Sequence, residues 1–129
     1  TNKLIIDSKI LNDKQKLQLM KWVPSGKKRR WKRIFRGSKD GFQSYQFHSK
    51  CDNKGATIAV IQSSIGNIFG GYTSIPWSSS GNYQFDPEAF IYLLKSKQRK
   101  GQKPTKWGVK GSNRNSVYHN SGYGVTFGG

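Results

Sequence analysis

The sequence predicts a single α+β domain in which two helices precede a set of antiparallel strands. Apolar residues recur at helical spacing before Pro24, whereas β-rich runs separated by turn residues follow Gly55. Although only 33% of the residues are hydrophobic, 17 are aromatic, and these supply a large buried area per side chain. We therefore expect residues 1–129 to form one folded domain.

The first helix is expected between a capping residue and a proline. Asn12 or Asp13 caps it, because both side chains accept hydrogen bonds from the free backbone amides of a first turn. Leu17, Leu19, Met20, Trp22 and Val23 follow at helical spacing. Residues 24–26, Pro-Ser-Gly, end the helix.

A short strand and a second helix are expected next. Alternation places Trp31 and Phe35 on one face, as in a strand over 31–35. Residues 38–41, Ser-Lys-Asp-Gly, then turn the chain into a helix over about 42–51, where the apolar residues pair at helical spacing.

Strand candidates occupy most of the chain after Gly55. They are ATIAVIQSS at 56–64, IFGGYTSI at 68–75, NYQF at 82–85, KWGV at 106–109 and SVYHN at 116–120. The turn residues 64–67 join the first two into a hairpin. The run AFIYLLK at 89–95 is too uniformly apolar for periodicity to decide between strand and helix. We expect a basic loop over 95–106.

Five blocks in this order resemble the TLDc domain family, over about residues 8–129. The blocks are SKDGF, FHSKCDNKGATIAVI, GNIFGGYTSIPW, DPEAFIYLL and YGVTFGG. The resemblance implies a β-sandwich of two antiparallel sheets flanked by helices. Members of the family usually continue through further strands after the last block, so it also implies a domain without its last C-terminal strands.

Gly70 and Gly71 interrupt a strand, where glycine weakens the backbone and gives no side chain to pack. Phosphate-binding loops place glycines before a helix, whereas these lead into the strand-like residues 72–75. We interpret the pair as structural, either at a bulge or beneath a neighbouring aromatic ring. Trp77 belongs to the same structural block.

The net charge of +17, from 23 Lys and Arg against 6 Asp and Glu, favours anionic partners. The candidate anion-binding residues are Lys27, Lys28, Arg29, Arg30, Lys32, Arg33, Lys97, Arg99 and Lys100. They belong to two basic runs, 27–33 and 95–106, which would make one phosphate-contacting face if the fold joins them. The first run is also compatible with a nuclear-import signal or a solvated loop. Few aromatic residues lie among them, so stacking on bases has little support.

Cys51 is the sole cysteine, which excludes an intramolecular disulfide and a cysteine cluster for zinc. His48 lies one helical turn earlier and is able to activate the thiol, so Cys51 is a redox candidate. The alternative, which we favour, is a thiol packed as a small hydrophobe. The sequence contains no catalytic motif or metal-binding pattern, and we expect neither an enzyme nor a cofactor or metal site.

These observations predict a non-enzymatic interaction module. The resemblance implies protection against oxidative stress and binding to the vacuolar-type proton ATPase through protein contacts. The alternative is a basic nucleic-acid-binding module that contacts phosphates through Lys27–Arg33 and Lys95–Lys106. No membrane-spanning run is present, and we expect an intracellular, cytoplasmic protein, with the nucleus as a further compartment.

Overall fold

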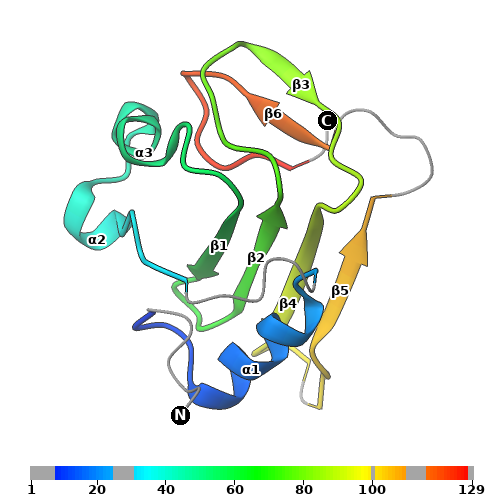
Figure 1. The fold of residues 1–129 in the computed structure, drawn as a ribbon. Coiled ribbons are helices and arrows are strands. Elements are labelled where there is room, and N and C mark those ends of the chain that lie inside the picture. The colour runs from blue at the N-terminus through cyan, green and yellow to red at the C-terminus, as the bar shows by residue number, and fades with distance from the viewer. Residues whose placement is uncertain (1–7, 25–30, 100, 110–115, 128–129) are drawn as a thin grey trace.

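The computed structural model describes residues 8–24, 31–99, 101–109 and 116–127, which form three short helices and two antiparallel sheets (Figure 1). The helices are α1 (Asp13–Trp22), α2 (Gly37–Asp40) and α3 (Ser44–Cys51). The strands are β1 (Thr57–Gln62), β2 (Ile68–Thr73), β3 (Asn82–Gln84), β4 (Phe90–Lys95), β5 (Thr105–Gly108) and β6 (Val117–His119). The predicted α+β class with two antiparallel sheets and flanking helices is confirmed.

Helix α1 begins at the predicted cap. The Asn12 side chain accepts a hydrogen bond from the backbone N–H of Gln15 at 2.8 Å, and the Gln15 side chain accepts one from the Asn12 N–H at 3.0 Å. This reciprocal capping box satisfies two amides that have no partner within the helix. Leu19 and Met20 are buried, so α1 packs its apolar face against the larger sheet.

The larger sheet has the strand order β1-β2-β4-β5, and the smaller sheet pairs β3 with β6. The predicted hairpin is confirmed, since β1 and β2 are antiparallel neighbours with Val60 opposite Gly70. The run that periodicity left undecided is β4. It forms a strand because β2 and β5 pair with its two sides.

The predicted strand over residues 31–35 is wrong. Only Trp31 forms an isolated bridge, and residues 32–36 belong to no strand or helix. Trp31 and Phe35, which were expected on one face of a strand, pack into different hydrophobic clusters. The Trp31 ring packs edge-on against Tyr72, and the Phe35 ring packs against Phe47. The segment therefore connects two hydrophobic clusters. The alternation of apolar residues arises because Trp31 packs into one cluster and Phe35 into the other.

Two separate hydrophobic clusters hold the domain together. The first lies between α1 and one face of the larger sheet, with Leu19, Val23, Tyr72, Phe90 and Tyr92 among its buried members. The second gathers around Trp77 and contains Phe47, Cys51 and Val117, with Val125 and Phe127 packed against them. Residues 120–127, the last segment described, thus pass from the small sheet towards the larger one (Figure 1).

Candidate functional site

The absence of a side chain at Gly70 lets an aromatic residue cross strand β2. Tyr92 lies directly opposite Gly70 on β4, and its hydroxyl donates a hydrogen bond of 2.6 Å to the carbonyl oxygen of Ala59 on β1. A Cβ atom at Gly70 would run into that carbonyl oxygen and would lie 2.5 Å from the Tyr92 hydroxyl. This glycine therefore permits one tyrosine to tie three strands together.

Gly71 makes room for a different ring. A Cβ atom there would lie 2.5 Å from the ring of Phe127, which belongs to the C-terminal segment. The break in strand register lies between Ile68 and Phe69, before the glycine pair. Close approach of the Ala59 carbonyl and the Tyr92 hydroxyl explains Gly70, and close approach of the Phe127 ring explains Gly71, more than the bulge does.

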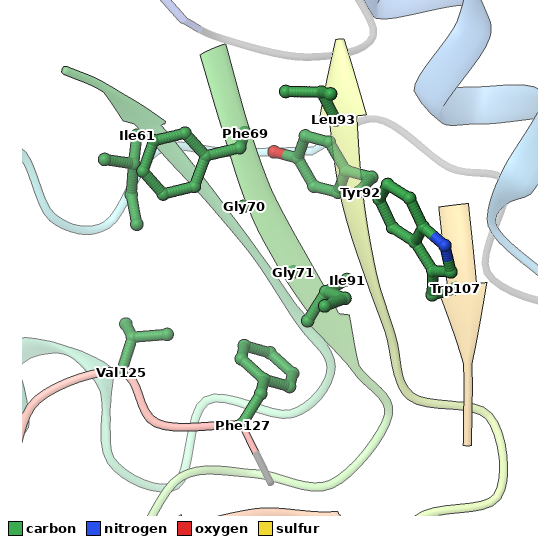
Figure 2. A pocket seen from close by; sticks show the side chains of 10 residues that line it. All are labelled: Ile61, Phe69, Gly70, Gly71, Ile91, Tyr92, Leu93, Trp107, Val125 and Phe127. Carbon is green, nitrogen blue, oxygen red and sulfur yellow. The ribbon is translucent and has the colours of Figure 1, made fainter. Parts of the chain in front are cut away.

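The two glycines lie in an open apolar groove on the larger sheet, with a volume of about 420 Å³ (Figure 2). It is lined by Ile61, Phe69, Gly70, Gly71, Ile91, Tyr92, Leu93, Trp107, Val125 and Phe127. Phe69 and Ile61 stand at one side, Trp107 at another, and Val125 and Phe127 close the end.

The groove exposes large apolar side chains to solvent. The exposed fractions are 37% for Phe69, 45% for Ile91 and 50% for Trp107. A folded domain seldom leaves several such residues side by side unless the surface contacts another molecule. We therefore take this groove, which we call the β-groove, as the candidate functional site.

The β-groove could not be predicted from the sequence, because its residues come from four strands and the C-terminal segment. One signal was present in the run AFIYLLK, which is apolar at nearly every position. A strand with apolar residues in both sets of alternating positions is typical of a sheet that is covered on both faces. In the structure α1 covers one face, whereas Ile91 on the other is only partly covered.

Trp77, expected to be structural, is nearly fully buried at the centre of the second cluster. Its indole N–H donates a hydrogen bond of 2.9 Å to the Thr57 hydroxyl on β1. Its ring also lies against His119 of β6, with centroids 5.1 Å apart. Trp77 thereby connects the two sheets.

His48 is a buried connector between α3 and the C-terminal segment. Its Nδ1 lies 2.6 Å from Asp52 Oδ1, and its Nε2 lies 2.8 Å and 2.6 Å from the carbonyl oxygens of Asn120 and Tyr123. Burial alone would lower the pKa of His48, but the hydrogen bond to Asp52, the two carbonyls and the Asp52 charge raise it above its ordinary value. Because hydrogen-bond acceptors face both nitrogens, the raised pKa favours the charged form of His48, and neither nitrogen is free to take a proton from a substrate.

Cys51, the redox candidate, is buried against Phe47 and Trp77. Burial, and then the charges of Asp52 and Asp40, raise the pKa of its thiol to about 11. A thiol with this pKa is almost entirely protonated at neutral pH and reacts slowly with oxidants. The hydrogen bonds of His48 go to Asp52 and to two backbone carbonyls, and none of them goes to the Cys51 thiol.

The candidate anion-binding residues that the structure describes come from two segments. Lys32 is exposed and Arg33 half-buried in the segment before α2, whereas Lys97 and Arg99 are exposed in the turn between β4 and β5, where the Lys97 N–H donates a hydrogen bond of 2.7 Å to the Asn67 side chain. The remaining candidates, Lys27, Lys28, Arg29, Arg30 and Lys100, lie outside the described residues. A single basic face therefore stays a prediction.

Substitution of His48 by glutamine tests its role as a connector. We expect a loss of about 1–3 kcal/mol in the free energy of unfolding at pH 6, because a charge-assisted bond and two carbonyl contacts disappear. Since folding raises the pKa of His48, its contribution is complete below about pH 6.5 and is lost as the pH rises through the folded-state pKa. Urea unfolding is measured from pH 5.5 to 9. The free energies of unfolding of the unmodified domain and of His48→Gln should become equal at high pH.

The titration of His119 makes stability depend on pH in the opposite direction. Burial, the first of its causes, lowers the pKa of His119, so its contribution exists above about pH 6.5 and is lost as the pH falls through and below that value. Both proteins contain His119, but the charge of His48 also lowers the pKa of His119, so the difference between the two proteins includes this coupling as well as the bonds of His48. A difference that does not change with pH would show that His48 is not the charged group described above.

Neither a metal site nor a membrane span is found in the described part of the chain. Residues 8–24, 31–99, 101–109 and 116–127 contain no group of three or more His, Cys, Asp and Glu that is able to hold a metal ion. No helix within those ranges combines the length and the apolar character needed to cross a bilayer.

Comparison with known proteins gives a family match and a distant relative. A family model described as the TLDc domain matches residues 4–129. A Danio rerio protein named MTOR-associated protein MEAK7 is 26% identical over 72 residues, which is 56% of this chain. The matched stretch spans 16% of the length of that relative.

Proposed function

This chain belongs to the TLDc domain family, and on that premise we propose that it is a non-catalytic module that binds other proteins through the β-groove. The observation that carries the proposal is the cluster of exposed apolar residues on the larger sheet, Phe69, Ile91 and Trp107. Tryptophan, the residue at position 107, is among the residue types that contribute most of the binding free energy at protein interfaces.

The chemistry of the buried groups supports a contact function over catalysis. Both ring nitrogens of His48 are engaged, and the Cys51 thiol is buried with a raised pKa. The Danio rerio relative is named for its association with MTOR, which agrees with a domain that works through protein contacts. The family resemblance further suggests the vacuolar-type proton ATPase as a partner and protection against oxidative stress as the cellular role.

The direct experiment is retention of purified vacuolar-type proton ATPase on the immobilised domain. Trp107→Thr removes an exposed aromatic side chain but keeps a residue that favours strands. We expect it to weaken retention about tenfold or more, since a central tryptophan contributes on the order of 2 kcal/mol at an interface. Leu17→Gln is the control, because Leu17 is 59% exposed on α1.

Retention that depends on Trp107 and is indifferent to Leu17 supports the proposal. Equal retention by both variants would place the contact elsewhere on the domain. No retention by the unmodified domain would exclude this ATPase as the partner.

Cys51→Ser should leave protection of cells against peroxide unchanged to within about twofold. One buried thiol with a raised pKa and no second cysteine is a poor peroxide-consuming group. The measurement is survival of cells that depend on this protein, with protein levels matched. Loss of protection by a variant with an unchanged melting curve would contradict the non-catalytic proposal.

The net charge of +17 supports binding of nucleic acid as a second candidate function. If basic residues contact phosphates, affinity for duplex DNA, single-stranded RNA and acidic vesicles should fall steeply with salt and depend little on base sequence. Replacing Lys28, Arg29, Arg30 and Arg33 by glutamine should weaken binding to all of these alike and flatten the salt slope. Absence of binding at low salt would remove this candidate.

A further inference from the structure

The outer edge of β5 borders the β-groove. Strand β5 pairs with β4 on one side, with Trp107 opposite Ile91 and Lys106 opposite Tyr92. On its other side no strand pairs with it among the residues described. The backbone amides and carbonyls along such an edge are able to pair with an additional strand.

The two faces of β5 differ in chemistry. Trp107 lines the β-groove, and half of its surface is exposed. The neighbouring residue, Lys106, lies on the opposite face of the sheet, where its ammonium is 4.8 Å from the centre of the Phe90 ring. Because side chains alternate along a strand, a segment paired with β5 would place every second residue on the sheet face that carries Trp107 and the others on the face that carries Lys106.

The charge around this edge is positive. The sequence after Glu88 contains no Asp or Glu. Arg99 and Lys103 are exposed in the turn that leads into β5, whereas Lys97 lies beside the β1–β2 turn, where its N–H donates a hydrogen bond to Asn67. The two ion pairs formed by the described residues, His48–Asp52 and Lys50–Asp40, involve none of these lysines and arginines. An acidic segment would therefore meet cations that have no acidic partner in the described part of the chain.

We infer that the edge of β5 captures an extended segment of a partner protein in which bulky apolar and acidic residues alternate. The apolar side chains enter the β-groove beside Trp107, and the acidic ones lie beside Lys106 and the basic residues Arg99 and Lys103 that precede β5. This inference rests on the proposed protein-binding function and specifies how the partner is recognised.

A second copy of this chain does not fit the same edge. Antiparallel pairing of two β5 strands would bring together two chains that each carry a net charge of +17. It would also place Lys106 near Lys106 of the second copy. Lysine at a sheet edge discourages pairing between identical chains. The same lysine attracts an acidic segment, so the edge discriminates between the two.

Synthetic peptides test this inference directly. The probe is a capped, fluorescently labelled ten-residue peptide that alternates isoleucine and glutamate, and its binding is measured by fluorescence anisotropy at 50 mM and 200 mM salt. One control has the same composition in two blocks, another carries lysine for glutamate, and a third has N-methylated amides at alternate positions. We expect the alternating peptide to bind at least tenfold more tightly than each of the three.

Variants of the domain show where the alternating peptide binds. Trp107→Thr and Lys106→Glu should each weaken binding about tenfold, and Lys14→Glu, the same charge change at an exposed position on α1, should weaken it less than threefold. Melting curves establish that each variant is folded. Hydrogen exchange of residues 105–108 should slow in the complex, because pairing protects edge amides.

Equal binding of the block and alternating peptides, or binding without protection of β5, would overturn the inference and leave only general charge attraction. Retention of the ATPase is measured separately with the Trp107 variant. If that retention depends on Trp107 while the peptides fail, edge pairing is wrong and the protein-binding function stands. If the peptides bind as expected and the ATPase does not, the edge is a binding site for another partner.

Discussion

Gly70→Ala is expected to lower the free energy of unfolding by about 3 kcal/mol, which corresponds to a fall of about 10 °C in melting temperature. The new methyl group would meet the backbone carbonyl of Ala59, which is fixed in strand β1, and the hydroxyl of Tyr92. Relief requires the strands to separate, and the hydrogen bond between Tyr92 and Ala59 is then lost. Urea and thermal unfolding measure the effect.

Two other glycines calibrate this result. At Gly108 on β5 an added Cβ meets no atom within 4 Å, so alanine there should change stability by less than about 0.5 kcal/mol. At Gly71 the obstacle is the Phe127 side chain, which is able to move, and we expect an intermediate loss. If Gly70→Ala melts like Gly108→Ala, the explanation of the glycine pair is wrong.

Asp86→Asn is expected to destabilise the domain by a similar amount, about 3 kcal/mol. Asp86 is fully buried, and its carboxylate accepts four hydrogen bonds: from the Thr73 hydroxyl at 2.6 Å, from the Ser74 N–H and hydroxyl at 2.7 Å each, and from the Glu88 N–H at 3.0 Å. An amide is the same size, but its NH₂ group would face donors, so buried polar groups would lose their partner.

Glu88→Gln is the matched control, because it makes the same chemical change two residues away on an exposed side chain. It should change the free energy of unfolding by less than about 0.5 kcal/mol. Equal melting temperatures for the Asp86 and Glu88 variants would contradict the role of Asp86 as the residue that anchors the turn before β4 to the end of β2.

Elements with strong local signals could be predicted from the sequence. The Asn12 cap and the apolar spacing before Pro24 identified α1, and turn residues between two β-rich runs identified the β1–β2 hairpin. The sequence did not decide between strand and helix for the run at 89–95. This run becomes strand β4 because it pairs with β2 and β5, which are distant in sequence. Residues 31–35 were misread because alternation does not reveal that Trp31 and Phe35 pack into different clusters.

The candidate site depended on contacts that no local pattern contains. The sequence indicated that Gly70 and Gly71 serve a structural purpose, but not that Tyr92 and Phe127 occupy the space they leave. Helical spacing placed His48 near Cys51, yet its ring nitrogens bond to Asp52 and to carbonyls more than 70 residues away. The β-groove likewise required the final register of the sheet before it could be recognised.

Site-specific photo-crosslinking tests the central claim, that the β-groove is the surface through which this domain contacts other proteins. A photoreactive phenylalanine analogue replaces Trp107 in one variant and Leu17 in another, and both are irradiated in cells. We expect protein adducts from position 107, with the same partner peptide recovered repeatedly by mass spectrometry, and none of these from position 17. The same adducts from both positions, or adducts from position 17 alone, would contradict it.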